Sequence, residues 1–194
     1  LGQTHGIRCL GPLVFENTCA LAMPRTRAAA MGIRSIDDLR SHAPSMRIGG
    51  DYEFFSRDEW KSVRQTYGLT FSENVPLDAT LMYSAAKEGL VDVIVAFSTD
   101  GRIAAYDLLV LKDPRGAFPP YDAVLLLSRA AAGNERLVSA LMPLVGSIAD
   151  EAMRLANKAV DLDGLPVAQA AEQLLSPQAA TAKPAASSPA PGTP

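Results

Sequence analysis

Short runs of β-branched and other apolar residues alternate along this chain with stretches that carry the signals of helices. The clearest run, residues 91–97 (VDVIVAF), is typical of a strand that is buried on both faces of a sheet. Before it, Asp78 can cap a helix over 79–88, which Gly89 would end. Because strands that alternate with helices pack as a sheet covered by helices, the sequence predicts an α/β fold with a mainly parallel sheet.

Capping and periodicity signals predict the other elements. Ser35 precedes a short helix over 36–39, and Ser56 and Glu59 have the spacing of a capping box that opens a helix ending near Gly68. Further strands are predicted at 18–23, 46–49, 103–111 and 124–127, and further helices at 134–145, 149–160 and 166–175. The helices gathered after residue 134 suggest that the chain leaves one sheet and finishes on another body.

Composition limits the classes of function that fit. The 194 residues carry a formal net charge of −3 and are 48% hydrophobic, which is enough apolar material for one core or two small lobes. Lys and Arg are not clustered, so nucleic acid is not an expected partner. No run of roughly 18 apolar residues predicts a membrane-spanning helix. No motif predicts a metal site or a cofactor. Cys9 and Cys19 form either one disulfide or two small buried apolar side chains.

The two ends of the chain differ from its body. Residues 1–6 (LGQTHG) contain neither Met nor the basic and apolar parts of a signal peptide. Either a leader or fusion segment was removed, or the chain is a fragment. Residues 176–194 consist mostly of Ala, Pro, Ser, Gly and Thr, a composition that cannot bury a core and predicts a disordered tail.

Four segments of the body together resemble the solute-binding proteins of osmoprotectant ABC importers, which capture glycine betaine, carnitine or choline. They are GPLVFENTCALAM (11–23), GGDYEFFSRDEW (49–60), VDVIVAFSTDGRIAAYDLLVLKD (91–113) and FPPYDAVLLL (118–127). They occur in the family's order, and the resemblance extends over residues 9–175. It implies an α/β, two-lobed periplasmic-binding-protein-like fold of type II, in which the chain passes from lobe one to lobe two and back.

The resemblance also implies a division of the chain into parts. Residues 1–13 would be the end of lobe one and the crossover, 14–117 lobe two, and 118–175 the return segment and C-terminal helices of lobe one, followed by the tail. The first half of lobe one has no counterpart here. Because that half supplies one tyrosine of the ligand cage and one wall of the cleft in the family, the site in this chain is expected to be incomplete.

The expected ligand sets the chemistry of the site. A trimethylammonium group cannot donate an ordinary hydrogen bond, so aromatic ring faces must hold it. The carboxylate of a betaine is matched by the fork of a guanidinium. By resemblance, Arg57 is the carboxylate ligand, and Glu53, four residues earlier, orients it or bridges the lobes. The alternative is that Glu53 and Arg57 form a solvated local ion pair.

The aromatic positions of the family are only partly kept. Tyr121 matches one cage position, and Phe97 stands where the family usually has a tyrosine. The family usually reads N-T-Y where this chain has Asn17, Thr18 and Cys19, and cysteine has no ring face. Asn17 is expected either to contact the ligand or to cap a turn. These departures leave open a different ligand or a degraded site.

The loop after the buried strand is expected to brace the two lobes. Thr99, Asp100 and Arg102 follow the strand at the end where α/β sheets present their functional loops. We expect them at the hinge side of the cleft, with Gly101 allowing a tight turn.

The expected function is therefore that of a binding component and not of an enzyme. It would capture a small zwitterion or quaternary amine at the periplasmic or extracytoplasmic face of the membrane, free, lipid-anchored or fused to the permease. Its partners would be a membrane permease and a separate ATPase, because the chain contains no G-x-x-x-x-G-K-[ST] loop.

Three other functions remain open. The chain could be the ligand-sensing domain of a regulator with the same fold, or a vestigial copy that binds nothing. An enzyme would use Cys19 as a nucleophile with His5 or His42 as its base.

Overall fold

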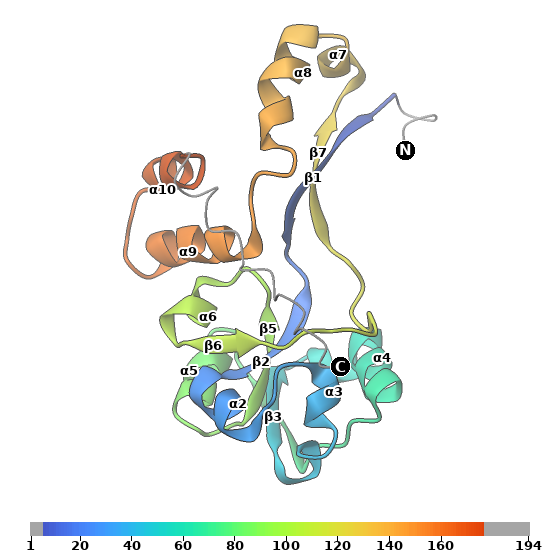
Figure 1. The fold of residues 1–194 in the computed structure, drawn as a ribbon, viewed down its shortest axis with the longest axis vertical. Helices are drawn as coiled ribbons and strands as arrows, with labels where there is room; N and C mark the ends of the chain where they lie inside the picture. The colour runs from blue at the N-terminus through green and yellow to red at the C-terminus, as the bar shows by residue number, and fades with distance from the viewer. Residues whose placement is uncertain (1–5, 177–194) are drawn as a thin grey trace, which may run out of the picture.

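A five-stranded sheet in the order β4-β3-β5-β2-β6 forms the centre of the computed structural model, which describes residues 6–176 (Figure 1). Its strands are β2 (Cys19–Pro24), β3 (Arg47–Asp51), β4 (Glu73–Leu77), β5 (Val93–Phe97) and β6 (Leu108–Val110). β3 is parallel to β4 and β5, whereas β2 is antiparallel to β5 and β6. The expected mainly parallel sheet is therefore confirmed for β3, β4, β5 and β6, which share one direction, whereas β2 alone runs the opposite way. The chain enters β2 at the edge where β5 ends, so β2 has to run in the opposite direction.

The buried strand was predicted correctly, and it separates two apolar clusters. Val93 and Val95 of β5 pack on one face of the sheet, whereas Ile94 and Ala96 pack on the other. The first face is covered by α2 (Arg25–Met31), α3 (Ile36–Leu39) and α4 (Asp58–Tyr67). The second is covered by α5 (Leu81–Lys87) and α6 (Gly101–Ala105). We call residues 19–118 the sheet body.

The predicted helix starts need two corrections. The helix expected after Ser56 begins at Asp58 with Arg57 as its N-cap, because the Ser56 hydroxyl donates to the carbonyl oxygen of Glu53 at 2.6 Å instead of capping the helix. Its end at Gly68 is confirmed, with Gly68 in the left-handed conformation at φ 63°. The helix expected from residue 79 begins two residues later, since the Asp78 side chain caps the turn at Thr80.

The expected strand at 103–111 was wrong over its first part. Asp100 accepts a hydrogen bond from the backbone N–H of Arg102 at 2.8 Å and starts α6, so only 108–110 form a strand. Two other elements on or beside the sheet were not predicted, and neither were the strand at Arg8–Glu16 and the helix at Arg129–Ala132 outside it. The helix α2 follows Pro24 with an Ala-rich run, and β4 is an edge strand that contains Pro76, a residue that obscures a strand pattern.

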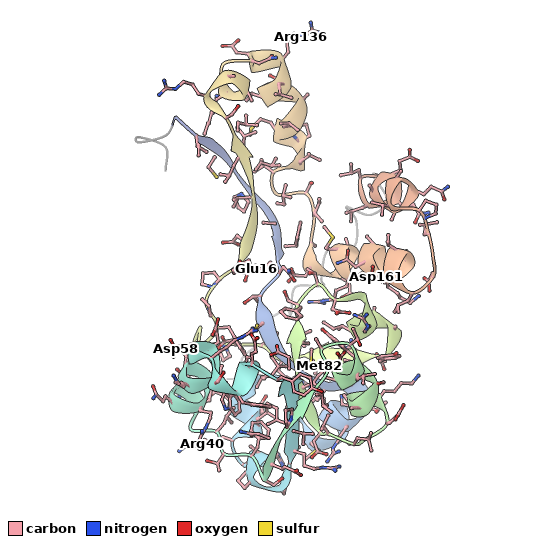
Figure 2. The ribbon with its side chains drawn as sticks, turned by 180° about the vertical axis from the view of Figure 1, so that it is seen from behind. Glu16, Arg40, Asp58, Met82, Arg136 and Asp161 are labelled. Atoms are coloured by element: carbon pink, nitrogen blue, oxygen red, sulfur yellow. The ribbon has the colours of Figure 1, made fainter. Side chains whose placement is uncertain are left out.

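Two long strands leave the sheet body together. β1 (Arg8–Glu16) pairs antiparallel with β7 (Asp122–Leu127), and the ladder extends away from the body to α7 (Arg129–Ala132) and α8 (Glu135–Leu141), as Figure 1 shows. We call β1, β7, α7 and α8 the arm. After it, α9 (Asp150–Asp161) returns to pack against α6, and α10 (Val167–Leu174) packs against α9. Figure 2 shows the same arrangement from behind, with Arg136 far from Asp58.

Several expectations concern the parts of the fold as a whole. The boundary placed at residue 14 falls inside β1, and the boundary at 117 falls in the loop before β7; the division into lobes stays a prediction. The predicted disordered tail lies outside the described residues, apart from Ser176. Within residues 6–176, no helix has the length and apolar character needed to cross a bilayer. The same residues contain no cluster of three or more side chains suited to hold a metal ion.

Candidate functional site

Three chain segments meet where the arm joins the sheet body. The backbone N–H of Asn17 donates to the carbonyl oxygen of Tyr121 at 3.2 Å, and the Thr18 hydroxyl donates to that of Pro119 at 3.0 Å. The N–H of Ser98, just after β5, donates to the carbonyl oxygen of Thr18 at 2.9 Å. The start of β2, the end of β5 and the segment before β7 are thus hydrogen-bonded to one another. Four predicted ligand contacts come from these segments: Asn17, Cys19, Phe97 and Tyr121.

Cys19 and Phe97 are direct neighbours across the sheet. They are paired residues of β2 and β5, so their side chains lie on the same face, and both are partly buried. Burial raises the pKa of the Cys19 thiol, while the nearby charge of Arg57 acts in the opposite direction. Cys9 lies exposed in β1, and both thiols are free. Because the two thiols are free, the predicted disulfide is wrong. Because Cys9 is exposed, the prediction of two buried apolar cysteines is wrong for Cys9.

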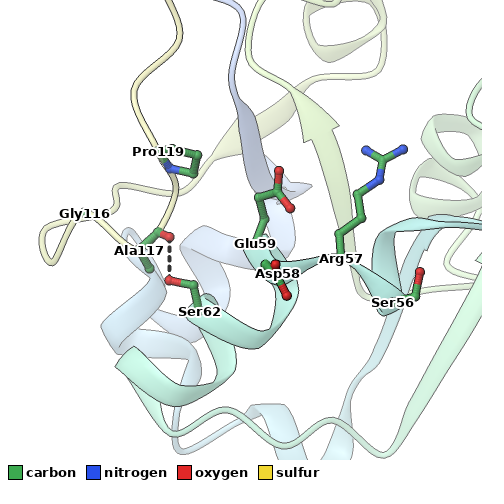
Figure 3. Close-up of a pocket in the computed structure, with 8 residues that line it drawn as sticks. All are labelled: Ser56, Arg57, Asp58, Glu59, Ser62, Gly116, Ala117 and Pro119. Carbon is green, nitrogen blue, oxygen red and sulfur yellow. Dashed lines mark hydrogen bonds between the residues drawn. The ribbon is translucent and has the colours of Figure 1, made fainter.

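Arg57 is held by two carboxylates at the start of α4. Its guanidinium lies 3.1 Å from Glu53 and 3.8 Å from Asp51. The hydrogen bond to Glu53 raises the pKa of Arg57, so the group remains charged. Figure 3 shows the Arg57 guanidinium and the Glu59 carboxylate pointing to the same side of the helix start. Because the Glu53 side chain is 79% exposed, the pair is a local one, and the Arg57 side chain is itself 37% exposed.

Two neighbouring pockets lie on either side of the loop at 116–119. The first pocket, of about 790 Å³, is open. It is lined by the N-cap Arg57, by Glu59 and Ser62 of α4, and by the loop (Figure 3). The second, of about 430 Å³, is lined by Cys19 and Arg154, among others. Both pockets share Gly116 and Pro119.

The predicted ligand contacts are distributed unevenly around these pockets. Arg57 lines the first and Cys19 the second, but Phe97, Tyr121, Asn17 and Glu53 line neither. Tyr121 is 69% exposed at the base of β7, and Phe97 lies beside Cys19. Asn17 accepts a hydrogen bond from the Thr99 hydroxyl at 3.0 Å. The structure thus brings together Cys19 and Phe97, and links Asn17 to the Tyr121 backbone.

The segment expected at the hinge connects the sheet body to α9. The Asn157 side chain donates to the carbonyl oxygen of Thr99 at 2.8 Å, and Arg154 donates to that of Ser98. Asp100 and Arg102 pair with each other at 3.0 Å. Their role in bracing two lobes stays a prediction.

Sequence reasoning missed the polar face of α9 that makes these contacts. Asp150, Arg154 and Asn157 lie four and then three residues apart, so they share one helix face. Asp150 accepts from the backbone N–H of Glu16 at 3.0 Å. The spacing was visible in the sequence, but it does not say which element the face meets.

Among the described residues suggested for an enzyme, Cys19 and His42 line different pockets. His42 lines a separate pocket with Asp37 and Arg40, and His5 lies outside the described residues. The raised pKa of Cys19 disfavours the thiolate, which is the nucleophilic form.

Comparison with known proteins identifies the family. Residues 1–176 match the family described as the substrate-binding domain of the ABC-type glycine betaine transport system. The carnitine transport binding protein OpuCC of Listeria monocytogenes is 31% identical over 150 residues, which are 76% of this chain and 49% of that protein. The ergothioneine transport permease/ergothioneine binding protein EgtU of Helicobacter pylori is 30% identical over 79% of this chain and 28% of its own length.

A solved structure shares the fold. A crystal structure described as a glycine betaine/carnitine/choline ABC transporter superposes with a TM-score of 0.85 at 30% identity, covering 90% of this chain and 65% of the other. The α/β fold is that of the type II periplasmic binding proteins. The chain spans half or less of the length of the two curated relatives. It belongs to the family of substrate-binding domains of ABC-type glycine betaine transport systems.

Proposed function

We propose that this chain is part of the solute-binding component of an ABC importer that captures a quaternary-amine osmoprotectant such as glycine betaine, carnitine or choline. The observation that carries the proposal is Arg57, a charged and partly exposed guanidinium that lines a pocket. It is the one positively charged side chain among the predicted ligand contacts, and a guanidinium matches a carboxylate with two hydrogen bonds. Membership of the family supports the same reading.

The cation would be held by aromatic rings above Cys19. Phe97 lies next to Cys19 across the sheet, and Tyr121 is exposed on the segment that Asn17 anchors. Each ring face contributes roughly 0.5–2 kcal/mol to binding a cation. With Cys19 in place of a ring, the cage lacks one face. Residues beyond this chain would complete the enclosure, in keeping with the greater length of the relatives.

The cycle would involve binding and closure without a change of covalent bonds. Ligand binding shifts the open–closed equilibrium of the binding protein, and the closed form is presented to a membrane permease that is driven by a separate ATPase. The component would act at the extracytoplasmic face of the membrane. Fusion to the permease is one arrangement, because the Helicobacter pylori relative is named as both permease and binding protein.

The proposal is tested by replacing Arg57 in the full-length protein. Arg57→Ala should weaken binding of glycine betaine and carnitine at least tenfold, because a charge-assisted hydrogen bond contributes about 1.5–3 kcal/mol. Choline has no carboxylate, so its affinity should stay within about twofold of that of the wild-type protein. Lys61→Ala, which removes an exposed charge from the same helix, is the control. Equal losses for all three ligands would contradict the assigned role of Arg57.

A further inference from the structure

The loop between β6 and β7 is held against α4 by hydrogen bonds around one buried tyrosine. Tyr67, the last residue of α4 and 2% exposed, donates its hydroxyl hydrogen to the carboxylate of Asp113. The Tyr67 oxygen accepts from the backbone N–H of Arg115 at 2.9 Å. The other oxygen of Asp113 accepts from the N–H of Phe118 at 2.8 Å. We call Tyr67 and Asp113 the clamp, because they fix both ends of the loop at 113–118.

Additional contacts tie the same loop to the same helix. The Ser62 hydroxyl donates to the carbonyl oxygen of Ala117 at 2.9 Å, as Figure 3 shows. The Arg115 guanidinium donates to the carbonyl oxygen of Thr66 at 3.0 Å and lies 5.2 Å from the centre of the Tyr67 ring. The loop therefore follows the last two turns of α4.

The helix and the loop each carry one proposed ligand contact. Arg57 is the N-cap of α4, and Tyr121 follows the loop three residues after Phe118. The intervening segment is fixed at Pro119, whose carbonyl oxygen accepts from Thr18. The separation between the Arg57 guanidinium and the Tyr121 ring thus depends on how the loop is held against α4.

We propose that Tyr67 and Asp113 are positioning residues that set the separation between the carboxylate contact at Arg57 and the aromatic contact at Tyr121. This inference rests on the proposed function, since it takes both of those residues as ligand contacts. The clamp acts through the loop and needs no contact with the ligand. It would determine which ligand length is preferred, because the carboxylate and the ammonium group lie farther apart in carnitine than in glycine betaine.

The test removes the hydroxyl and leaves the buried ring. In full-length Tyr67→Phe, the backbone amides of Arg115 and Phe118 should exchange their hydrogens faster. The ratio of the dissociation constants for carnitine and glycine betaine should change by about two- to tenfold, the range that loss of one hydrogen bond implies. Calorimetric titration with both ligands gives the ratio. Asp113→Asn is the second variant, because its amide nitrogen cannot accept a hydrogen bond.

Two substitutions away from the clamp serve as matched controls. Tyr106→Phe removes a hydroxyl on the opposite face of the sheet, and Asp107→Asn alters an exposed ion pair; both should leave the ratio unchanged. Faster exchange in Tyr67→Phe with an unchanged ratio would overturn the inference, and so would unchanged exchange. Failure of the wild-type protein to bind either ligand would overturn the proposed function and this inference together. If the wild-type protein binds both ligands and both clamp variants keep the wild-type ratio of dissociation constants, this inference alone would be overturned.

Discussion

At the scale of single residues, Cys19 has the largest influence on the chemistry of the pocket. It lines the second pocket and stands beside Phe97, where the resemblance implies a tyrosine. Its thiol supplies neither a ring face nor, with its pKa raised by burial, a thiolate. The resemblance in the sequence singled out this position and Arg57, whose role as ligand contacts stays a prediction. It could not identify Arg154 or Asn157, because their contacts depend on where α9 packs.

Restoring the ring should strengthen binding. We predict that Cys19→Tyr in the full-length protein raises the affinity for glycine betaine by about two- to thirty-fold, corresponding to one additional cation–π contact. Calorimetric titration measures the change. Cys9→Tyr, at an exposed position in β1, is the control and should have no effect. An equal or lower affinity for Cys19→Tyr would show that this position does not face the ammonium group.

The buried phenol of the clamp predicts a dependence of stability on alkaline pH. Burial, and next the hydrogen bond to Asp113, raise the pKa of Tyr67 to about 12. The folded state thus favours the protonated phenol. This contribution to stability is complete below the unfolded pKa of about 10 and is lost as the pH rises towards 12. Between pH 8 and pH 11, the free energy of unfolding measured with urea should fall more for the wild-type protein than for Tyr67→Phe. Equal losses would contradict the assignment.

At the scale of elements, the contact between α6 and α9 connects the sheet body to the C-terminal helices. A β-carbon at Gly101 would lie 2.4 Å from the backbone nitrogen of Lys158 and 2.5 Å from its Cα atom. Only glycine allows the two helices to approach so closely. The sequence suggested a turn at Gly101, but not a helix contact, because the two positions are distant in the chain.

Gly101→Ala should therefore separate α9 from α6. We predict a lower melting temperature and faster amide exchange at Ser98 and Thr99, whose carbonyl groups α9 holds. Gly89→Ala is the control for position-specific effects, since a β-carbon there meets no atom within 4 Å, although its φ of 75° carries its own strain. If exchange near Ser98 were the same in both variants, the close packing of α9 would not hold this loop.

Prediction from the sequence succeeded where the signals were local. The strand at β5, the end of α4 at Gly68 and the helices α9 and α10 were placed within two residues. The ladder of β1 and β7 was not predicted as a pair, because it joins residues more than 100 positions apart. The reversed direction of β2 was not predicted either, since it depends on where the chain enters the sheet.

At the scale of the whole molecule, the arm and α9 expose several large apolar side chains. Val124 and Leu126 of β7 are 43% and 53% exposed, and Leu155 of α9 is 52% exposed. A two-stranded ladder by itself is only marginally stable in water. The solved relative is longer, and this chain covers 65% of it. We therefore expect additional polypeptide to cover this surface in the full-length protein.

That expectation can be tested with one polar substitution. Leu155→Asp in the full-length protein should lower the free energy of unfolding by about 2–4 kcal/mol, because it places a charge in a buried apolar contact. Leu81→Asp, which alters a similarly exposed leucine of α5, should change it by less than about 0.5 kcal/mol. Urea unfolding measures both. Equally small effects would mean that α9 stays exposed.

The central claim, capture of a quaternary amine, is tested most directly by titrating the full-length wild-type protein with glycine betaine, carnitine, choline and ergothioneine. Trp60 reports the change, because it is buried in α4 three residues after Arg57. We predict a saturable change in Trp60 fluorescence with at least one ligand that has a quaternary ammonium group. A folded protein that responds to none of the four, and that shows no heat of binding in calorimetry, would contradict the account.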